Sequence, residues 1–570
     1  MASESQVSGT SKAALFTLKL HRGDGMTLVA MNWKKGKPAK DFVGFAIEYQ
    51  EPGGDRFYAL KNRLNFLKAD GSVDKESKST RLSPIQKFRW VHFPRNAEMD
   101  GKFIYRVTPA FMNDAGELSY GEAQEAAIEL RRETYPGQLN VTFTRGFVSS
   151  QAFVDRYESK GDISTLLPEK ADDGLTFVPT HPLANEALAW MGFEARDAIL
   201  ELLDEAIADK QAQVRVVAYD LSEPEVVSRL EKIGARLKII IDNDGPHADP
   251  ASGETQAEKR LALSAGAANV KRQHMGKLQH NKTIVVDGPK IQAVVCGSTN
   301  FSWRGFFVQA NNAVVMRGKS AIKPFAAAFD QYWASNSVDA FGQTPSAQWS
   351  DLKLKGIKAK VSFSPHAPAN ALLDAIAADV AGGTTSNLFY SLAFLYQTPG
   401  AMQDAIKKVM QDKKLFVYGI SDRKVGGLDV QLPEGRIEPM RPAALTQNVP
   451  EPFKSEPVGG GGTRMHHKFV VIDFDKPSAR VYLGSYNFST AADKSNGENL
   501  VLIRDRRIAT SYMIEALRLF DHYHFRVTQA DAKKEKEKLH LRKPPTAGEV
   551  AWWDEDWKDA RKIRDRELFA

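Results

Sequence analysis

Residues 465–500 read MHHKFVVIDFDKPSARVYLGSYNFSTAADKSNGENL, and this stretch predicts the architecture of most of the chain. His466 and Lys468 are two residues apart, so on an extended chain their side chains point to the same face. The four apolar residues after Lys468 are typical of a buried strand, which Asp473 closes at a turn. A second short strand leads into GSYNFS, where small residues let a ligand approach the backbone closely.

The same pattern occurs once before. His280, Lys282 and Asp287 repeat the spacing H-x-K-x-x-x-x-D, and a strand then leads into GSTNFS at 297–302. Two copies of one motif with the same sequel form an internal repeat and predict two related halves. The alternative is that each histidine caps a strand while each lysine and aspartate is solvated surface; it leaves the repetition without a cause.

The residue types in these motifs favour a bound anion. Two histidines and two aspartates could bind a divalent cation, but two lysines in the same cluster would repel it. Hydroxyl groups and amide donors complete the set: Ser298, Asn300, Ser485 and Asn487. Such a set suits the non-bridging oxygens of a phosphoryl group, and it requires no metal ion or other cofactor.

Two histidines beside a phosphodiester have a natural division of labour. One attacks phosphorus and forms a covalent phosphohistidine. The other protonates the leaving oxygen and then deprotonates the water that releases the product. Asp287 and Asp473 would each fix the tautomer of a histidine and stabilise its imidazolium.

The repeated motifs resemble the two HKD motifs of the phospholipase D superfamily, over about residues 175–525. The resemblance implies two α/β/α halves whose motifs meet at one site, and metal-independent phosphodiester hydrolysis or phosphatidyl transfer. It implies His280 as the nucleophile and His466 as the acid and base, although the residues alone do not order the two. It also implies that each motif's aspartate pairs with the opposite histidine, which would place Asp473 beside His280.

One position distinguishes the halves. The family often has a glutamate after each G-S-x-N, and Glu498 stands 14 positions after Gly484. The same offset after Gly297 gives Asn311 instead. We therefore expect the two histidines to have fixed rather than interchangeable roles.

The composition is that of a globular protein of several domains, with 570 residues, 42% of them hydrophobic and 26% charged. No apolar run is long enough to span a membrane. The first residues show no secretory signal, so we expect a cytoplasmic protein or export by a signal-independent route. The single cysteine, Cys296, excludes an intrachain disulfide. The net charge of +7 permits phosphate-rich partners without requiring them.

Residues 1–135 predict an all-β sandwich. Apolar runs alternate with turn signals such as Pro52-Gly53-Gly54. The segment 101–123 is similar to the last strands of a fibronectin type III-like module, which would bind a partner or space domains. The stretch 134–146 would link this module to the main body.

Alternating strands and helices begin at 173. The first half, 173–340, and the second half, 355–525, each predict a largely parallel sheet covered by helices. We expect a strand at 175–179 to open the first half. His181 and His366 stand at matched places in the two halves, where they either line the cleft or mark a helix entry.

The remaining segments carry weaker signals. The tail, 526–570, is charged and contains Trp552, Trp553 and Trp557, which either dock a C-terminal helix or contact a membrane or partner. The glycine run at 459–463 predicts a loop beside the site, and no Gly-Lys-Ser/Thr follows it, which excludes a Walker loop.

The motifs leave three functions open. A phospholipid headgroup is the favoured substrate, with a peripheral membrane contact and no transmembrane segment. A DNA or RNA endonuclease is the alternative, favoured by the basic balance and by the run at 271–277, although no aromatic–basic groove is visible. A binding protein with an inactive site is disfavoured because both motifs are complete.

Overall fold

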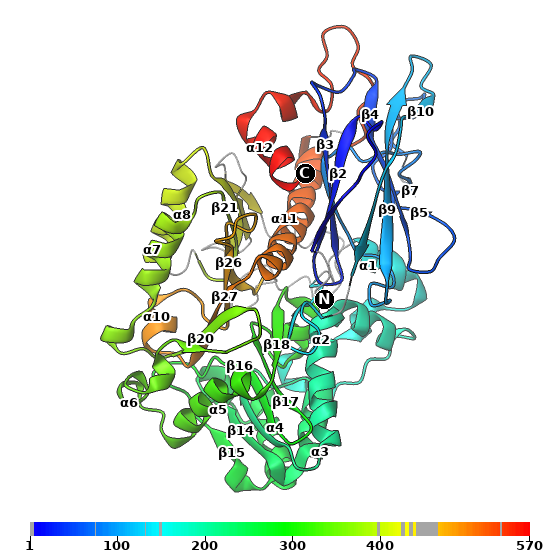
Figure 1. The fold of residues 1–570 in the computed structure, drawn as a ribbon. Coiled ribbons are helices and arrows are strands. Elements are labelled where there is room, and N and C mark those ends of the chain that lie inside the picture. Colours follow the sequence, from blue (N-terminus) through cyan, green and yellow to red (C-terminus); the bar gives the residue numbers. More distant parts are fainter. Residues whose placement is uncertain are drawn as a thin grey trace. The chain divides into compact units, whose positions relative to one another are not determined.

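The computed structural model describes residues 5–74, 76–130, 133–146, 151–395, 399–422, 428–431, 437–440, 465–535 and 539–570. The chain forms two compact units (Figure 1). The first includes Met1–Arg132 and Thr510–Ala570, and the second includes Glu133–Gln431 and Ile437–Ala509. The expected glycine loop at 459–463 lies outside the described residues.

The first unit contains the predicted β-sandwich. One antiparallel sheet has the order β1 (Gln6–Ser8), β2 (Phe16–Arg22), β3 (Thr27–Trp33) and β8 (Arg89–His92). The other has β10 (Leu118–Tyr120), β9 (Lys102–Met112), β4 (Phe42–Gln50) and β5 (Tyr58–Ala59), with β11 (Gln124–Glu129) also paired to β9. Apolar side chains of both sheets form one core, in which Phe16 and Phe45 lie with ring centroids 5.1 Å apart. The likeness to a fibronectin type III module stays a prediction.

The tail is part of this unit, so the predicted boundary at 526 is wrong. The helix α11 (Arg506–Glu535) runs through that boundary, and α12 (Ala560–Phe569) follows it. Trp553 is 5% exposed within the sandwich core. The indole N–H of Trp552 donates to the carbonyl of Phe42 at 3.0 Å, and that of Trp557 donates to Gly36 at 2.9 Å. These contacts fit the docking interpretation of the three tryptophans.

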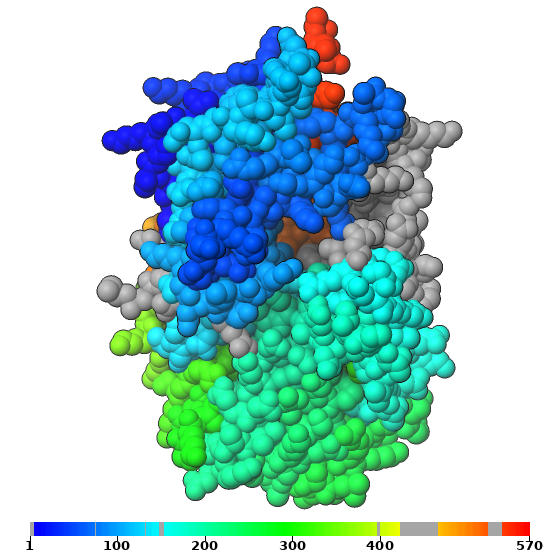
Figure 2. Space-filling model, turned by 90° about the vertical axis from the view of Figure 1, so that its right-hand side faces the viewer, coloured from blue at the N-terminus to red at the C-terminus, as the bar shows by residue number. Residues whose placement is uncertain are grey.

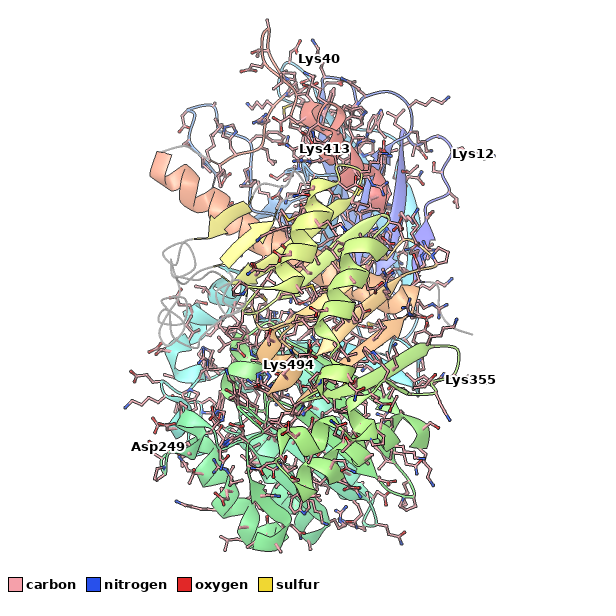
Figure 3. All side chains as sticks on the ribbon, turned by 90° about the vertical axis from the view of Figure 1, so that its left-hand side faces the viewer. Lys12, Lys40, Asp249, Lys355, Lys413 and Lys494 are labelled. Atoms are coloured by element: carbon pink, nitrogen blue, oxygen red, sulfur yellow. The ribbon has the colours of Figure 1, made fainter. Side chains whose placement is uncertain are left out.

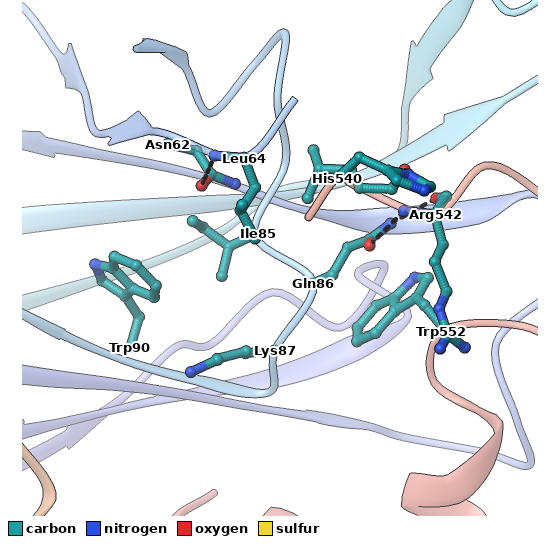
Figure 4. Close-up of a pocket in the computed structure, with 10 residues that line it drawn as sticks. Asn62, Leu64, Ile85, Gln86, Lys87, Trp90, His540, Arg542 and Trp552 are labelled. Carbon is teal, nitrogen blue, oxygen red and sulfur yellow. Dashed lines mark hydrogen bonds between the residues drawn. The ribbon is translucent and has the colours of Figure 1, made fainter. Parts of the chain in front are cut away.

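The tail also closes a cavity of about 250 Å³ on the first unit (Figure 4). Trp90 and Trp552 line it together with the basic side chains of Lys87, His540 and Arg542. The side-chain amide of Gln86 accepts from the backbone N–H of Arg542 at 2.9 Å and donates to its carbonyl at 2.7 Å. The cavity therefore lies between the sandwich and the tail.

The second unit is built on two mixed sheets. The first, from edge to edge, has β12 (Leu139–Phe143), β18 (Asn312–Arg317), β17 (Gln292–Gly297), β16 (Lys282–Asp287), β13 (Gln213–Ala218), β14 (Leu237–Ile241) and β15 (Val270–Arg272). The second has β19 (Ser350–Asp351), β20 (Lys358–Ser364), β27 (Glu498–Arg504), β26 (Arg480–Gly484), β25 (Lys468–Ile472), β21 (Asn387–Leu392), β22 (Phe416–Asp422), β23 (Leu428–Gln431) and β24 (Ile437–Met440). The order β18-β17-β16-β13-β14 matches β27-β26-β25-β21-β22, which confirms the two related halves.

The expectation of largely parallel sheets is wrong. Among the described strands, only β13-β14-β15 and β21-β22 pair in parallel. The motif strand β16 turns back into β17 through residues 288–291, and β25 returns as β26. Connections this short permit antiparallel neighbours and exclude a crossover.

Helices cover both faces of the first sheet and pack against the second, as in the predicted α/β/α halves. In the first half, α2 (Ala184–Ala208), α3 (Pro224–Ile233) and α4 (Gly253–Ala265) share a core with the sheet, and α5 (Lys319–Ala334) packs against β16 and β17. In the second half, α7 (Leu373–Gly383) and α8 (Ala401–Gln411) pack in the same way as part of that half's core. Side chains of both alternating sets on the motif strands are buried, as a sheet covered on both faces requires.

The first half begins differently from the prediction. Residues 175–179 form no strand, and Pro179 would interrupt one. The strand β12 comes instead from the expected linker, and its five residues are buried and pair with β18. It occupies the place that β20 has beside β27.

Exposed residues 158–160 belong to the segment between β12 and α2, which Figure 2 shows in cyan on the surface.

Candidate active site

Each motif lies where its strand begins. Lys282 and Lys468 open β16 and β25, and the preceding His280 and His466 stand just outside the strands. The ammonium of Lys282 donates to the carbonyl of His280, and that of Lys468 donates to the carbonyl of His466 at 2.7 Å. All four residues are at most 5% exposed. A histidine and a lysine are therefore fixed side by side in each half.

The two motifs meet across the boundary between the halves. Gln279 bridges to Gly497 and Ala310 bridges to Met465, so each motif lies against a loop of the other half. Nδ1 of His280 lies 2.7 Å from Oε2 of Glu498. In the matching arrangement, Nδ1 of His466 lies 2.9 Å from Oδ1 of Asn311. The structure thus confirms that Glu498 and Asn311 occupy equivalent places.

A second pair of contacts repeats the symmetry behind the histidines. The amide of Asn499 donates to Oδ1 of Asn281 at 2.9 Å, and the amide of Asn312 lies 3.3 Å from Nδ1 of His467. His467 thus contacts Asn312, whereas His466 contacts the preceding Asn311. The two halves are thus joined by matched polar contacts.

The aspartates of the motifs do not reach the histidines, so the expectation of Asp473 beside His280 is wrong. Asp473 stands at the far end of β25, and its carboxylate accepts from the backbone N–H groups of Thr385, Ser386 and Asn387. Asp287 ends β16, opposite Gln292. A strand of five or six residues spans roughly 16–20 Å, which separates its two ends beyond contact. Glu498 therefore supplies the carboxylate that orients His280.

The serines and asparagines shape the loops around the histidines. Ser298 donates to Asn311 at 2.9 Å, and Ser485 accepts from the backbone N–H of Asn499 at 3.0 Å. The amide of Asn300 donates to Asp220 at 2.6 Å. Within the described residues, the Oδ1 atoms of Asn300 and Asn487 are buried with no hydrogen-bond partner.

Burial and neighbouring charges set the protonation of the site. Burial lowers the pKa of His280 against the attraction of Glu498, and burial with the charge of Lys468 holds the pKa of His466 well below its ordinary value. Burial lowers the pKa of Lys282 to about 8. Burial alone would raise the pKa of Glu498, but His280 and Lys282 hold it below its usual range. Near neutral pH the site therefore holds two neutral imidazoles and a charged Lys282.

A polar cluster beside the first motif was missed from the sequence. The ring of Tyr219 lies 4.6 Å from the rings of both His280 and His247. His247 lies 3.3 Å from Asp220 through Nε2 and 2.8 Å from Asp242 through Nδ1. Only the position of Tyr219 and Asp220 in the chain could have indicated this cluster. They directly follow β13, in which Ala218 pairs with Lys282, so they must lie beside the motif.

The same cluster is the part of the described chain that most resembles a metal site. Ligand atoms of Asp220, His247 and Glu254 lie within 4.8 Å of one another. Both ring nitrogens of His247 face carboxylates, which leaves no lone pair directed at a cation, and Lys282 adds positive charge nearby. The donor set fits an internal hydrogen-bond network better than a metal ion.

Three other histidines serve the fold, namely His181 and His366, which were singled out in the sequence, and His274 in the basic run at 271–277. His181 accepts from the backbone N–H of Leu183 at the entry of α2. His366 lies 2.8 Å from Asp493 and 2.9 Å from Ser362 in the interior of the second half. His274 contacts Asn243 at 2.8 Å. The helix-entry interpretation therefore fits His181, and none of the three joins the two motifs.

Comparison with known proteins agrees with this geometry. A family described as "Cardiolipin synthase, PLD-like domain" matches residues 200–333 and 390–519. Phospholipases D of Rickettsia prowazekii (strain Madrid E) and Rickettsia bellii (strain RML369-C) are 48% and 46% identical over 48 residues. That match covers 8% of this chain and 22% of each relative, so the chain spans about a fifth of their length.

Two solved structures show a weaker similarity to the chain. Phosphatidylserine synthase of Haemophilus influenzae Rd KW20 is 15% identical, with a TM-score of 0.39 over 66% of this chain and 93% of that chain. Nuc from Salmonella typhimurium, a phospholipase D family member, is 25% identical, with a TM-score of 0.20 over 25% of this chain and 87% of that chain. With the family's domain present twice and both motifs meeting at one site, the chain belongs to the phospholipase D superfamily.

Proposed function

We propose that the chain is a metal-independent phosphodiesterase that works through a covalent phosphohistidine. The observation that carries the proposal is the pair of buried histidines, each fixed at Nδ1 and each beside a buried lysine. The lysines would neutralise the phosphoryl oxygens, the task that a metal ion has in other phosphodiesterases.

The partners of Nδ1 fix the tautomers. Glu498 is a carboxylate, so Nδ1 of His280 donates to it and Nε2 carries the lone pair. The amide of Asn311 donates to the carbonyl of Gly305 at 2.9 Å, which turns its oxygen toward His466. Nδ1 of His466 therefore donates as well. Both rings would present Nε2 to the substrate.

The charge difference between the partners supports distinct roles. Glu498 would stabilise the positive ring that forms when His280 attacks phosphorus, so we assign His280 as the nucleophile. Asn311 is neutral and leaves a protonated His466 a stronger acid, so we assign His466 to protonate the leaving oxygen and then to activate water. The negative charge of the bound phosphodiester would raise the pKa of His466 into the working range.

We propose a phospholipid headgroup as the substrate. The cardiolipin synthase description and the phospholipases D among the relatives support a lipid. Two cations of the basic run that favoured a nuclease are used internally: Lys271 donates to the carbonyl of Trp333 at 2.7 Å, and Arg272 donates to the carbonyl of Asp242 at 3.0 Å. Among the described helices, none is long and apolar enough to cross a bilayer, so contact with lipid would be peripheral.

The test is turnover of choline-releasing phospholipid vesicles and of plasmid DNA, side by side in excess chelator. Loss of lipid cleavage in both His280→Ala and His466→Ala, with wild-type activity intact in chelator, is the expected result. Nicking of DNA alone would replace the lipid substrate by nucleic acid. Added glycerol or ethanol would separate hydrolysis from transfer, because a transferase forms the new phosphatidyl alcohol.

A further inference from the structure

A network of three titratable residues borders the first motif and extends the proposed function, on which this inference rests. We propose that Asp220, His247 and Asp242 are positioning residues: the two carboxylates keep the buried Lys282 charged, His247 bridges the carboxylates, and Asp220 holds Asn300 in place. The network would let the first motif present a cation to the phosphoryl group in an interior where an isolated ammonium is unfavourable.

The hydrogen bonds form a continuous path around the motif. Oδ1 of Asp242 accepts from the backbone N–H of Gln279, the residue before His280, at 2.6 Å. Oδ2 of Asp242 lies 2.8 Å from His247, which reaches Asp220. Asp220 then accepts from Asn300 of the G-S-x-N segment. A shift of any member would move either the histidine loop or the asparagine.

The geometry gives His247 a positive charge. Each ring nitrogen faces a carboxylate, so both must carry hydrogen to satisfy both contacts. Burial opposes the charge, but hydrogen bonds from His247 to Asp220 and Asp242, together with the charge of Glu254, raise the pKa of His247 to about 10. The two aspartates and Glu254 then face a positively charged His247.

Lys282 is held between groups from several elements. Glu498 on β27, Asp220 after β13 and Asp242 after β14 attract its charge. The imidazoles of His280 and His466 also lie within electrostatic range of Lys282. The ring of Tyr219 lies 4.6 Å from the ammonium, close enough for a cation–π contact. Two of the three attracting carboxylates thus belong to the network.

The second half has a different side chain at the position equivalent to Asp220. Ala218 pairs with Lys282, and Leu392 pairs with Lys468. Two residues beyond these positions, Asp220 in the first half corresponds to Phe394 in the second. The ring of Phe394 lies 6.3 Å from that of His466. The carboxylate of Asp220 therefore has no counterpart in the second half, whereas Asp242 corresponds to Asp422; the difference at Asp220 supports a role specific to the nucleophile's side.

Charge balance gives a test in which two substitutions act in opposite directions. The pH dependence of kcat/KM on bis(p-nitrophenyl) phosphate would be measured for full-length wild type, Asp220→Asn, His247→Gln and the double variant. In Asp220→Asn, which lacks the carboxylate, the pH at which kcat/KM falls on the alkaline side would decrease by about one unit. In His247→Gln, which lacks the imidazolium, that pH would increase by a similar amount. The double variant would return near wild type, and Asp220→Glu would keep the wild-type limb.

Asp249→Asn is the matched control (Figure 3). Asp249 is an exposed acid on the loop that carries His247, and its substitution changes the net charge by the same amount as Asp220→Asn. Equal shifts in one direction, or none, for Asp220→Asn and His247→Gln would overturn the proposal. Activation of the wild type by a divalent cation that is lost in Asp220→Asn would also overturn it and make the cluster a metal site.

A binding measurement separates this inference from the proposed activity. Tungstate binding would be followed by calorimetry across the same pH range, since the charge of this anion is constant there. If the wild type hydrolyses no diester, the proposed function fails, yet opposite shifts of tungstate binding in the two variants would still support the network. Identical binding profiles in all variants would exclude it.

Discussion

Nδ1 of His280 lies 2.7 Å from Oε2 of Glu498, a residue 218 positions later in the chain. The partner of His466 comes across the same boundary, from Asn311. Each half therefore lacks the group that orients its own histidine. A complete site requires both halves. Because one histidine contacts a carboxylate and the other an amide, the two histidines are not equivalent.

This asymmetry predicts that substitutions at Glu498 and at Asn311 have different effects on activity. Glu498→Gln keeps the shape but removes the charge that stabilises the phosphorylated ring, so kcat should fall by about 10²- to 10⁴-fold. Asn311→Asp should instead move the acid limb of the pH–rate profile upward, because a new carboxylate favours protonated His466. Steady-state kinetics on one diester would show both effects. Equal losses of kcat with unmoved pH profiles would contradict the assignment.

The same assignment predicts which histidine carries the intermediate. With a p-nitrophenyl leaving group, attack needs little acid assistance, so His466→Asn should form the phosphohistidine but release it slowly. Mass spectrometry after rapid quenching at alkaline pH should place the phosphate on His280. His280→Asn is the control and should trap nothing. Phosphate on His466 in that control would reverse the two roles.

Lys282 predicts an alkaline limit of activity. Its pKa of about 8 means that the charge is present below that value and is lost as the pH rises through it. We expect kcat/KM to fall above pH 8 in wild type. Lys282→Arg should move this limb upward, because a guanidinium stays charged, at some cost in geometry. A flat profile to pH 9.5 in wild type would remove Lys282 from phosphate binding.

Most of the second unit could be predicted because its signals are local or repeated. The repeat gave the two halves, the offset of Glu498 from Gly484 gave the unequal partners, and both were confirmed by contacts across the halves. The parallel sheets were wrong because alternating strands and helices describe the start of each half, whereas the motif strands form antiparallel hairpins. Only the length of the turn at 288–291 carried that information.

Other features could not be read locally. Asp473 falls within the motif spacing, yet spacing along a strand does not say which end faces the site. Asp220, Asp242 and His247 are brought together by tertiary packing from three separate segments, so no motif joins them. The residues Leu139–Phe143 resembled a linker because a single edge strand has no partner in the local sequence.

The tail predicts a stability effect confined to the first unit. Trp553 is 5% exposed in the sandwich core, so Trp553→Ala should cost about 3–5 kcal/mol in the free energy of unfolding of that unit. Leu15→Ala, at a side chain that is 48% exposed, is the control and should cost little. Denaturant unfolding followed by tryptophan fluorescence would measure both. An unchanged midpoint for Trp553→Ala would contradict docking of the tail.

Asp473 predicts a loss of stability without a loss of chemistry. Its buried carboxylate accepts from three successive backbone N–H groups and from the hydroxyl of Thr385. An uncharged side chain leaves some of these donors unpaired, so Asp473→Asn should cost about 2–4 kcal/mol in the free energy of unfolding. The kcat per folded molecule, counted by tungstate binding, should stay within about threefold of wild type. Asp287→Asn, at the partly exposed end of the matching strand, should change neither quantity much. A large fall in kcat for correctly folded Asp473→Asn would return this aspartate to the catalytic machinery, which its place at the far end of β25 argues against.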